Sequence, residues 1–171
     1  KRMDMKDKKL LSDIKEYLKC YENQVLEDWY ELIRHISVSE TGEGIETCCD
    51  WIQKKMEEIG IQVTKYSVKP APVLVGRFGN DPEKKTVLIY AHYDVKPAGE
   101  RKLWHSDPFV PTVRDGKVYA RGSADNKSPL MAHLKALEYF IRRKMEVPVN
   151  VIFVFEGDEE PEIFYIGIGN F

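Results

Sequence analysis

Apolar side chains recur at helical spacing in three stretches of the chain. Over residues 3–36 they lie three, four or seven positions apart, which predicts an amphipathic helix. The polar pair Glu22-Asn23 leaves open a division of this stretch into two helices. The same spacing predicts helices over residues 45–59 and 128–144, and a glycine stands directly after the first of these, where helices often end.

Apolar runs of strand length stand between and after these helices. They are Gln62–Val68, Val73–Phe78, Thr86–Ala91 and Val149–Phe155. The last two are almost wholly apolar, and short runs of this kind are typical of strands that are buried on both faces. Residues 96–123 are rich in proline, glycine and charge, which predicts a long ordered loop with short strands. The order of these elements predicts an α/β domain with a mostly parallel or mixed central sheet flanked by helices.

The overall composition excludes several classes of protein. The 171 residues carry 26 basic and 28 acidic side chains, so the formal charge of −2 argues against a dedicated nucleic-acid or anionic-membrane binder. A hydrophobic fraction of 43% is ordinary for a globular domain. We find no apolar run long enough for a transmembrane helix and no signal-peptide pattern, so we expect no membrane association.

The three cysteines are too few and too irregular for a disulfide framework, which favours a reducing, cytoplasmic setting. Cys48 and Cys49 are adjacent and have two interpretations. They could form a thiolate metal pair, or they could lie on a buried helix face. We favour the buried face, because a free cysteine usually behaves as a small hydrophobic residue.

Three polar clusters follow predicted strands or precede a predicted helix. They are His92-Tyr93-Asp94, the loop Arg121–Lys127 and the acidic run Glu156–Glu160. In open α/β sheets ligands bind beyond the carboxyl ends of the strands, so the three clusters are expected to meet at one edge. Each also has a structural interpretation: a hydrogen-bonded histidine, an N-cap at Asp125 and a solvated acidic loop.

Taken together, these clusters contain a histidine and several carboxylates, and no cysteine stands in them. Imidazole suits zinc and other transition ions, and carboxylates extend the choice to manganese or magnesium. A carboxylate such as Asp125 can bridge two ions, as in two-metal hydrolases. The adjacent Glu159 and Glu160 can divide the remaining work, one as a metal ligand and one as a proton carrier.

In this order, the motifs resemble those of the M20 family of metallopeptidases. The matching stretches are HYDVKP (92–97), WHSDPF (104–109), DGKVY (115–119), RGSADNK (121–127) and EGDEE (156–160). The residues of these motifs are most similar to those of the carnosinase-like dipeptidase and carboxypeptidase branch. The resemblance implies a three-layer, zinc-exopeptidase-like fold. It also implies hydrolysis of an amide or peptide bond in a dipeptide or a small acylated amino acid.

The resemblance also implies a role for each site residue. His92, Asp125 and Glu160 would bind two divalent metal ions, with Asp125 as the bridge. Zinc is expected, with manganese or cobalt as alternatives. Asp94 would orient His92, and the peptide bond after Asp125 would be cis. Glu159 would be the general base and then the acid, while a metal-bridging hydroxide attacks the carbonyl. His35, His105 and His133 are expected to be structural.

The resemblance further implies how the chain is organised. Residues 1–36 would be an N-terminal helical segment, residues 37–160 the metal-site core and residues 161–171 an atypical tail. Family members carry two further ligands downstream, an Asp and a His, and a lid domain through which they can form homodimers. We therefore expect this chain to hold part of a catalytic domain and to be inactive alone. The alternatives are a metal- or partner-binding fragment, an N-acyl amino acid deacylase and, more weakly, a two-metal phosphohydrolase.

Overall fold

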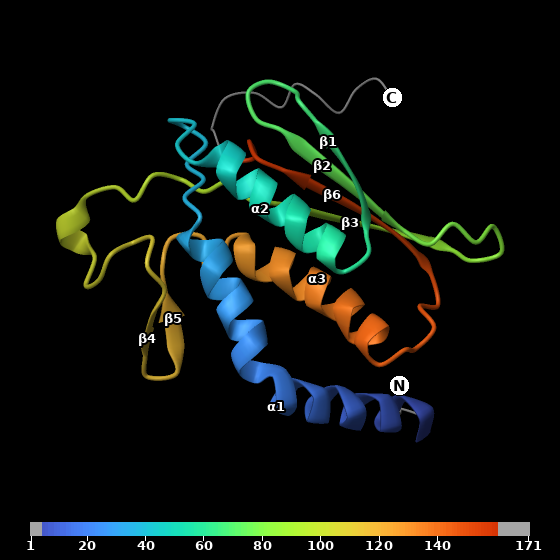
Figure 1. Ribbon diagram of the computed structural model, residues 1–171. Coiled ribbons are helices and arrows are strands. Elements are labelled where there is room, and N and C mark those ends of the chain that lie inside the picture. Colours follow the sequence, from blue (N-terminus) through green and yellow to red (C-terminus); the bar gives the residue numbers. More distant parts are fainter. Residues whose placement is uncertain (1–4, 161–171) are drawn as a thin grey trace.

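The computed structural model describes residues 5–160, and the expected tail at 161–171 lies outside them. Figure 1 shows how the described elements are arranged. The helices are α1 (Met5–Arg34), α2 (Ile45–Glu58) and α3 (Lys127–Arg142), with a short 3-10 turn at Arg101–Leu103. The strands are β1 (Gln62–Tyr66), β2 (Val73–Phe78), β3 (Thr86–His92), β4 (Thr112–Arg114), β5 (Lys117–Tyr119) and β6 (Asn150–Glu156). None of these helices combines the length and apolarity that crossing a bilayer requires.

The main sheet is mixed and has the strand order β1-β2-β6-β3. β1, β2 and β6 pair in antiparallel fashion, whereas β3 and β6 run parallel, with His92 beside Glu156 at their carboxyl ends. The parallel pair is joined through α3, as parallel strands require a crossover connection. The predicted α/β class is confirmed, and the topology brings the ends of β3 and β6 to the same edge.

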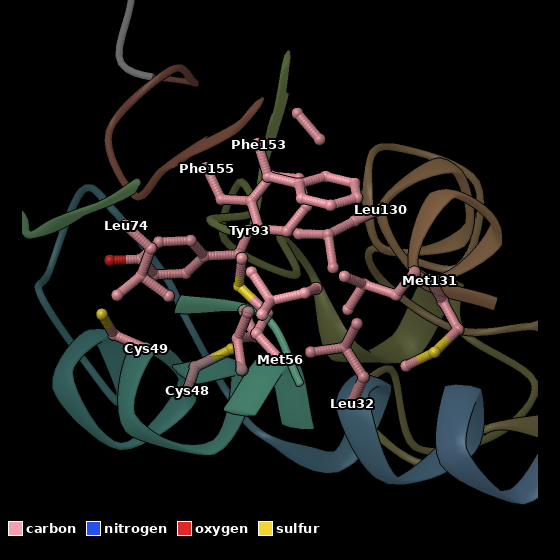
Figure 2. Close-up of a cluster of buried hydrophobic side chains, with 14 of the residues drawn as sticks. Leu32, Cys48, Cys49, Met56, Leu74, Tyr93, Leu130, Met131, Phe153 and Phe155 are labelled. Carbon is pink, nitrogen blue, oxygen red and sulfur yellow. The ribbon is translucent and has the colours of Figure 1, made fainter. Parts of the chain in front are cut away.

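The hydrophobic core lies between the sheet and the helices α2 and α3. Its centre is formed by fully buried side chains from both layers, shown in Figure 2, among them Met56, Leu74, Leu130, Phe153 and Phe155. Burial of each such side chain contributes roughly 1.5–3 kcal/mol. Because α2 packs on β1 and β2 while α3 packs on β3, one face of the sheet is covered from edge to edge.

The interpretation of residues 86–91 as a strand buried on both faces is wrong for the described part of the chain. Leu88 is 63% exposed and Tyr90 is 48% exposed. The physical reason is that β3 is an edge strand of the described sheet and that α2 and α3 cover only one of its faces. Only Ala91 and His92, at the end of the strand that leads into the polar edge, are buried.

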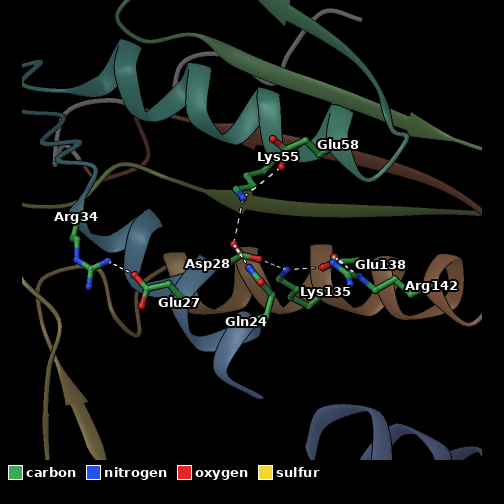
Figure 3. A network of polar contacts seen from close by, with 9 residues as sticks. All are labelled: Gln24, Glu27, Asp28, Arg34, Lys55, Glu58, Lys135, Glu138 and Arg142. Atoms are coloured by element: carbon green, nitrogen blue, oxygen red, sulfur yellow. Dashed lines mark hydrogen bonds and ion pairs between the residues drawn. The ribbon is translucent and has the colours of Figure 1, made fainter. Parts of the chain in front are cut away.

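The first predicted helix is a single element. α1 continues through Glu22 and Asn23 without interruption and bends partway along its length (Figure 1). Its second half is joined to α2 and α3 by a polar network, shown in Figure 3. At the centre of this network Asp28, which is 6% exposed, accepts hydrogen bonds from Lys135 and Lys55.

The two adjacent cysteines belong to the buried face of α2, as the favoured interpretation predicted. Cys48 and Cys49 are both 0% exposed and are part of the core cluster. Burial raises the pKa of Cys49 to about 11. Both thiols therefore pack as small hydrophobic groups within the core.

Candidate metal centre

The three polar clusters meet at the carboxyl edge of the sheet. His92 is the last residue of β3, and the run that ends at Glu160 follows β6, the neighbouring parallel strand. Asp125 belongs to the loop that precedes α3, the helix connecting these two strands. The site therefore forms where one β-α-β unit closes, which is the position expected for ligand binding in such a sheet.

His92 is buried, and its two ring nitrogens face different groups. Nδ1 lies 3.3 Å from Oδ1 of Asp94, while Nε2 lies 3.1 Å from Oδ1 of Asp125 and 3.6 Å from Oε2 of Glu159. A carboxylate at one ring nitrogen orients the imidazole and leaves the other nitrogen for a ligand. This geometry agrees with the expected pairing of His92 and Asp94.

Asp94 makes contacts that the sequence did not predict. Its side chain is fully buried, and it accepts hydrogen bonds from the backbone N–H groups of Glu159, at 3.1 Å, and Glu160, at 3.0 Å. Although burial opposes ionisation, the hydrogen bonds from His92 and from these two N–H groups lower the pKa of Asp94. One carboxylate thus holds both the imidazole and the backbone of the two glutamates.

The loop around Asp125 differs from the N-cap interpretation. Asn126, and not Asp125, occupies the N-cap position of α3, and it makes no side-chain capping bond. The side chain of Asp125 is 74% exposed and points its Oδ1 at His92, which frees it for binding. The peptide bond between Asp125 and Asn126 is cis, as the family resemblance implied.

His92, Asp125 and Glu160 form the group of described residues that could hold a metal ion. One ligand atom from each lies within 4.8 Å of the others. Once a metal displaces the proton of its imidazole, His92 forms with the two carboxylates a donor set that suits zinc, manganese or cobalt. The residues present therefore fit a divalent cation.

The electrostatics of the site also favour a cation. Although burial opposes its protonation, the hydrogen bond and charge of Asp94 and the charges of Glu159 and Asp125 raise the pKa of His92 to about 9. Burial and the neighbouring charge of Asp125 raise the pKa of Glu160. Crowded carboxylates repel one another, and a bound cation would relieve this repulsion.

Glu159 differs from Glu160 in its exposure to solvent. The side chain of Glu159 is 48% exposed, whereas that of Glu160 is 14% exposed and lies 3.8 Å from the ammonium of Lys96. The pair thus combines one enclosed carboxylate with one that reaches solvent. This difference matches the expected division between a metal ligand and a proton carrier.

The other histidines stay outside the group. His35 directly follows α1, and its ring contacts the ring of Trp51 in α2. His105 is exposed in the long loop, and His133 lies on α3. None of the three is part of the group of candidate ligands found among residues 5–160.

Lys127 is a buried polar residue that the sequence reasoning did not select. It is 1% exposed, and its ammonium donates to the backbone carbonyl of His35 at 2.5 Å. The only available signal was its place two residues after Asp125, because burial of a lysine cannot be read from local spacing.

Comparisons with known proteins find relatives of this chain. The sequence profile described as Peptidase family M20/M25/M40 matches residues 88–170. The Cys-Gly metallodipeptidase dug1 of Schizosaccharomyces pombe is 43% identical over 110 residues, which are 62% of this chain and 23% of that protein. The succinyl-diaminopimelate desuccinylase of Thiobacillus denitrificans is 35% identical over 130 residues, which are 76% of this chain and 32% of that protein.

A solved structure shows the same fold. The crystal structure of human carnosine dipeptidase 1 superposes with a TM-score of 0.81 at 29% identity and covers 90% of this chain and 36% of that one. The chain thus spans about a third or less of the length of the relatives it matches. The profile match, the sequence relatives and the shared fold together show that the chain belongs to the M20 peptidase family.

Proposed function

We propose that the protein carrying this chain hydrolyses an amide or peptide bond in a dipeptide or a small acylated amino acid, with the help of bound divalent metal ions. The observation that carries the proposal is the convergence of His92, Asp125 and Glu160 at the carboxyl edge of the sheet. The matched relatives are named as dipeptidases and a desuccinylase, which supports this class of substrate.

Each candidate ligand has a place in the proposed site. His92 would help to hold one ion and Glu160 a second, and Asp125 would be shared between the two. Zinc is the expected metal, with manganese or cobalt as alternatives. When bound, such ions polarise the substrate carbonyl and acidify a water molecule at neutral pH.

The remaining steps are carried out by the chain's own residues. Glu159 has an exposed carboxylate near Nε2 of His92, so it accepts a proton from the attacking water and then passes it to the leaving amine. Asp94 keeps the His92 ring oriented and, through its two backbone hydrogen bonds, holds Glu159 and Glu160 in place. Substrate positioning and any homodimer are left to other parts of the protein.

Two alternatives remain. A deacylase is favoured by the match to the desuccinylase, since both reactions cleave an amide bond with the same groups. The second alternative is a fragment that binds metal or a partner without chemistry.

The proposal is tested by the substitution Glu159→Gln in the full-length, metal-loaded protein. Loss of the proton carrier is expected to lower kcat by about 100-fold to 10,000-fold. Metal content should stay unchanged, because Glu159 is not a ligand. The control is Glu83→Gln in the exposed turn before β3, which should leave kcat unchanged.

The substrate panel consists of Cys-Gly, β-Ala-His and an N-succinyl amino acid. Preferred turnover of a dipeptide supports the dipeptidase, and preferred turnover of the succinyl compound selects the deacylase. If the protein binds metal but turns over none of the three substrates, the dipeptidase and the deacylase proposals are both contradicted. The alternative of a metal-binding fragment without catalytic activity is then supported. Full activity of the Glu159→Gln variant would contradict the proposed mechanism.

A further inference from the structure

Lys127 is a buried cation in the first turn of α3, two residues after Asp125. Its side chain is 1% exposed, and its ammonium donates to the His35 carbonyl at 2.5 Å. Burying a charge is costly unless the charge is paired and hydrogen-bonded. Burial lowers the pKa of Lys127, and the charges of the neighbouring Cys48 and of the fully buried Asp94 oppose part of this shift.

The stem of Lys127 lies close to Gly122 in the loop that presents Asp125. The backbone N–H of Lys127 donates to the carbonyl of Gly122 at 3.2 Å, which closes this loop. A Cβ on Gly122 would lie 2.7 Å from Cγ1 of Val95 and 3.3 Å from Cδ of Lys127. The loop, the lysine stem and the segment after His92 are therefore in close contact.

The residues between α1 and α2 are joined to both halves of the site. On one side Val95 donates to the carbonyl of Ser37 at 2.8 Å, and Ser37 Oγ donates to the carbonyl of Tyr93 at 2.6 Å. On the other side the His35 carbonyl accepts the hydrogen bond from Lys127. This short connector is thus a common anchor for the segment that carries His92 and for the loop that carries Asp125.

We propose that Lys127 is a positioning residue, whose ammonium, hydrogen-bonded to the His35 carbonyl, sets the place of Asp125 relative to His92. The inference rests on the proposed function only because it takes His92 and Asp125 as metal ligands. Lys127 itself touches neither metal nor substrate. Because it links the two halves of the site, its loss is expected to weaken metal binding more than it weakens the fold.

The test compares Lys127→Met with Lys135→Met in the full-length protein. Both residues are lysines of α3 with little exposure, but Lys135 is only partly buried and pairs with Asp28 and Glu138 in the polar network of Figure 3, away from the metal ligands. The readouts are the Kd of Zn²⁺, measured by competition with a chelator, the midpoint of thermal unfolding of the metal-free protein, and kcat and KM for a dipeptide.

Lys127→Met is expected to raise the Kd of Zn²⁺ by about 10-fold to 100-fold, the range seen when a group supporting a metal ligand is lost. A comparable fall in kcat with a smaller change in KM should accompany it. Lys135→Met should lower the thermal midpoint and leave the Kd of Zn²⁺ within about twofold of its original value, because it destabilises the helices without touching the loop.

A folded Lys127→Met variant with unchanged Zn²⁺ affinity would overturn the proposal, and so would an equal loss of affinity in both variants. Should Lys127→Met fail to fold, Lys127→Gln carries the same test, since its shorter, uncharged side chain takes the ammonium away from the His35 carbonyl but keeps a polar end. Failure of both to fold would assign Lys127 to folding as a whole and overturn the positioning role.

The affinity measurement also separates this proposal from the proposed function. If the unchanged protein has no hydrolase activity but the Lys127 variant binds Zn²⁺ more weakly, the positioning role is supported and the proposed hydrolase function is contradicted. If the unchanged protein is an active hydrolase and the Lys127 variant binds Zn²⁺ with unchanged affinity, the proposed function is supported and the positioning role is contradicted.

Discussion

The carboxylate of Asp94 accepts a hydrogen bond from the backbone N–H of Glu160, with 3.0 Å between Oδ2 and the nitrogen. The two residues are 66 positions apart and follow neighbouring parallel strands. Since the same carboxylate also faces the ring of His92, two candidate ligands from different strands depend on one buried side chain.

This relationship predicts that Asp94→Asn weakens metal binding. The amide keeps one acceptor oxygen but places an N–H₂ group where a backbone N–H or the imidazole needs an acceptor. The Kd of Zn²⁺ should rise by about 10-fold to 100-fold, as measured by chelator competition.

The control for this substitution is Asp107→Asn, because Asp107 accepts from the backbone N–H of Phe109 in an exposed loop away from the ligands. Its Zn²⁺ affinity should match that of the unchanged protein. Equal affinities in the Asp94 and Asp107 variants would contradict the role of Asp94.

A second prediction concerns Gly122, which has a φ of +78° and close neighbours. Gly122→Ala should destabilise the protein through the left-handed backbone, which costs about 1–2 kcal/mol, and through collision with Val95. The displaced loop should also lower Zn²⁺ affinity. Chemical denaturation and metal titration measure the two effects.

Gly116 is a matched control for this prediction. Its φ is +70°, but a Cβ there would meet nothing within 4 Å. Gly116→Ala should therefore show only the backbone cost and no loss of metal affinity. If the two alanine variants behave alike, close packing at Gly122 has no consequence for the site.

A third prediction concerns the pH dependence of stability. Although burial opposes its ionisation, the hydrogen bonds and charges of Lys135 and Lys55 hold the pKa of Asp28 below its ordinary value of 3.8. A lowered folded-state pKa stabilises the fold above the unfolded-state pKa, and this stabilisation is lost as the pH falls through the folded-state value. Asp28→Asn should cost about 1.5–3 kcal/mol near neutral pH, since it removes the charge-assisted hydrogen bonds that Asp28 accepts from the partly buried Lys135 and Lys55.

The measurement is the free energy of unfolding of both proteins as a function of pH. The difference between them should stay constant down to about pH 4 and shrink below it, where Asp28 of the unchanged protein becomes protonated. A difference that grows on acidification would have the wrong sign for a carboxylate of lowered pKa.

The core offers a fourth prediction. Phe153 is fully buried between the sheet and the helices, so Phe153→Ala should lower the free energy of unfolding by about 3–5 kcal/mol. Leu103→Ala is the comparison, because Leu103 is 73% exposed in the long loop and its loss should cost less than about 0.5 kcal/mol. The free energy of unfolding is measured by urea denaturation. If Phe153→Ala and Leu103→Ala lower it by similar amounts, Phe153 does not contribute to the core as described.

Much of the fold follows from local patterns in the sequence. The range of β2 and the buried face of α2 agree with the apolar spacing, because periodicity reports which side of an element is buried. The meeting of His92, Asp125 and Glu160 was also expected. It follows from a rule about strand ends and from the resemblance to the family, neither of which requires knowledge of contacts.

Other features were decided only by the tertiary structure. The exposure of Leu88 depends on which face of β3 the helices cover, and the two backbone hydrogen bonds of Asp94 depend on the register between β3 and β6. The burial of Lys127 depends on the connector between α1 and α2, whose carbonyl it binds across 92 positions. Spacing within a segment describes only that segment, whereas these contacts arise from packing between segments far apart in the chain.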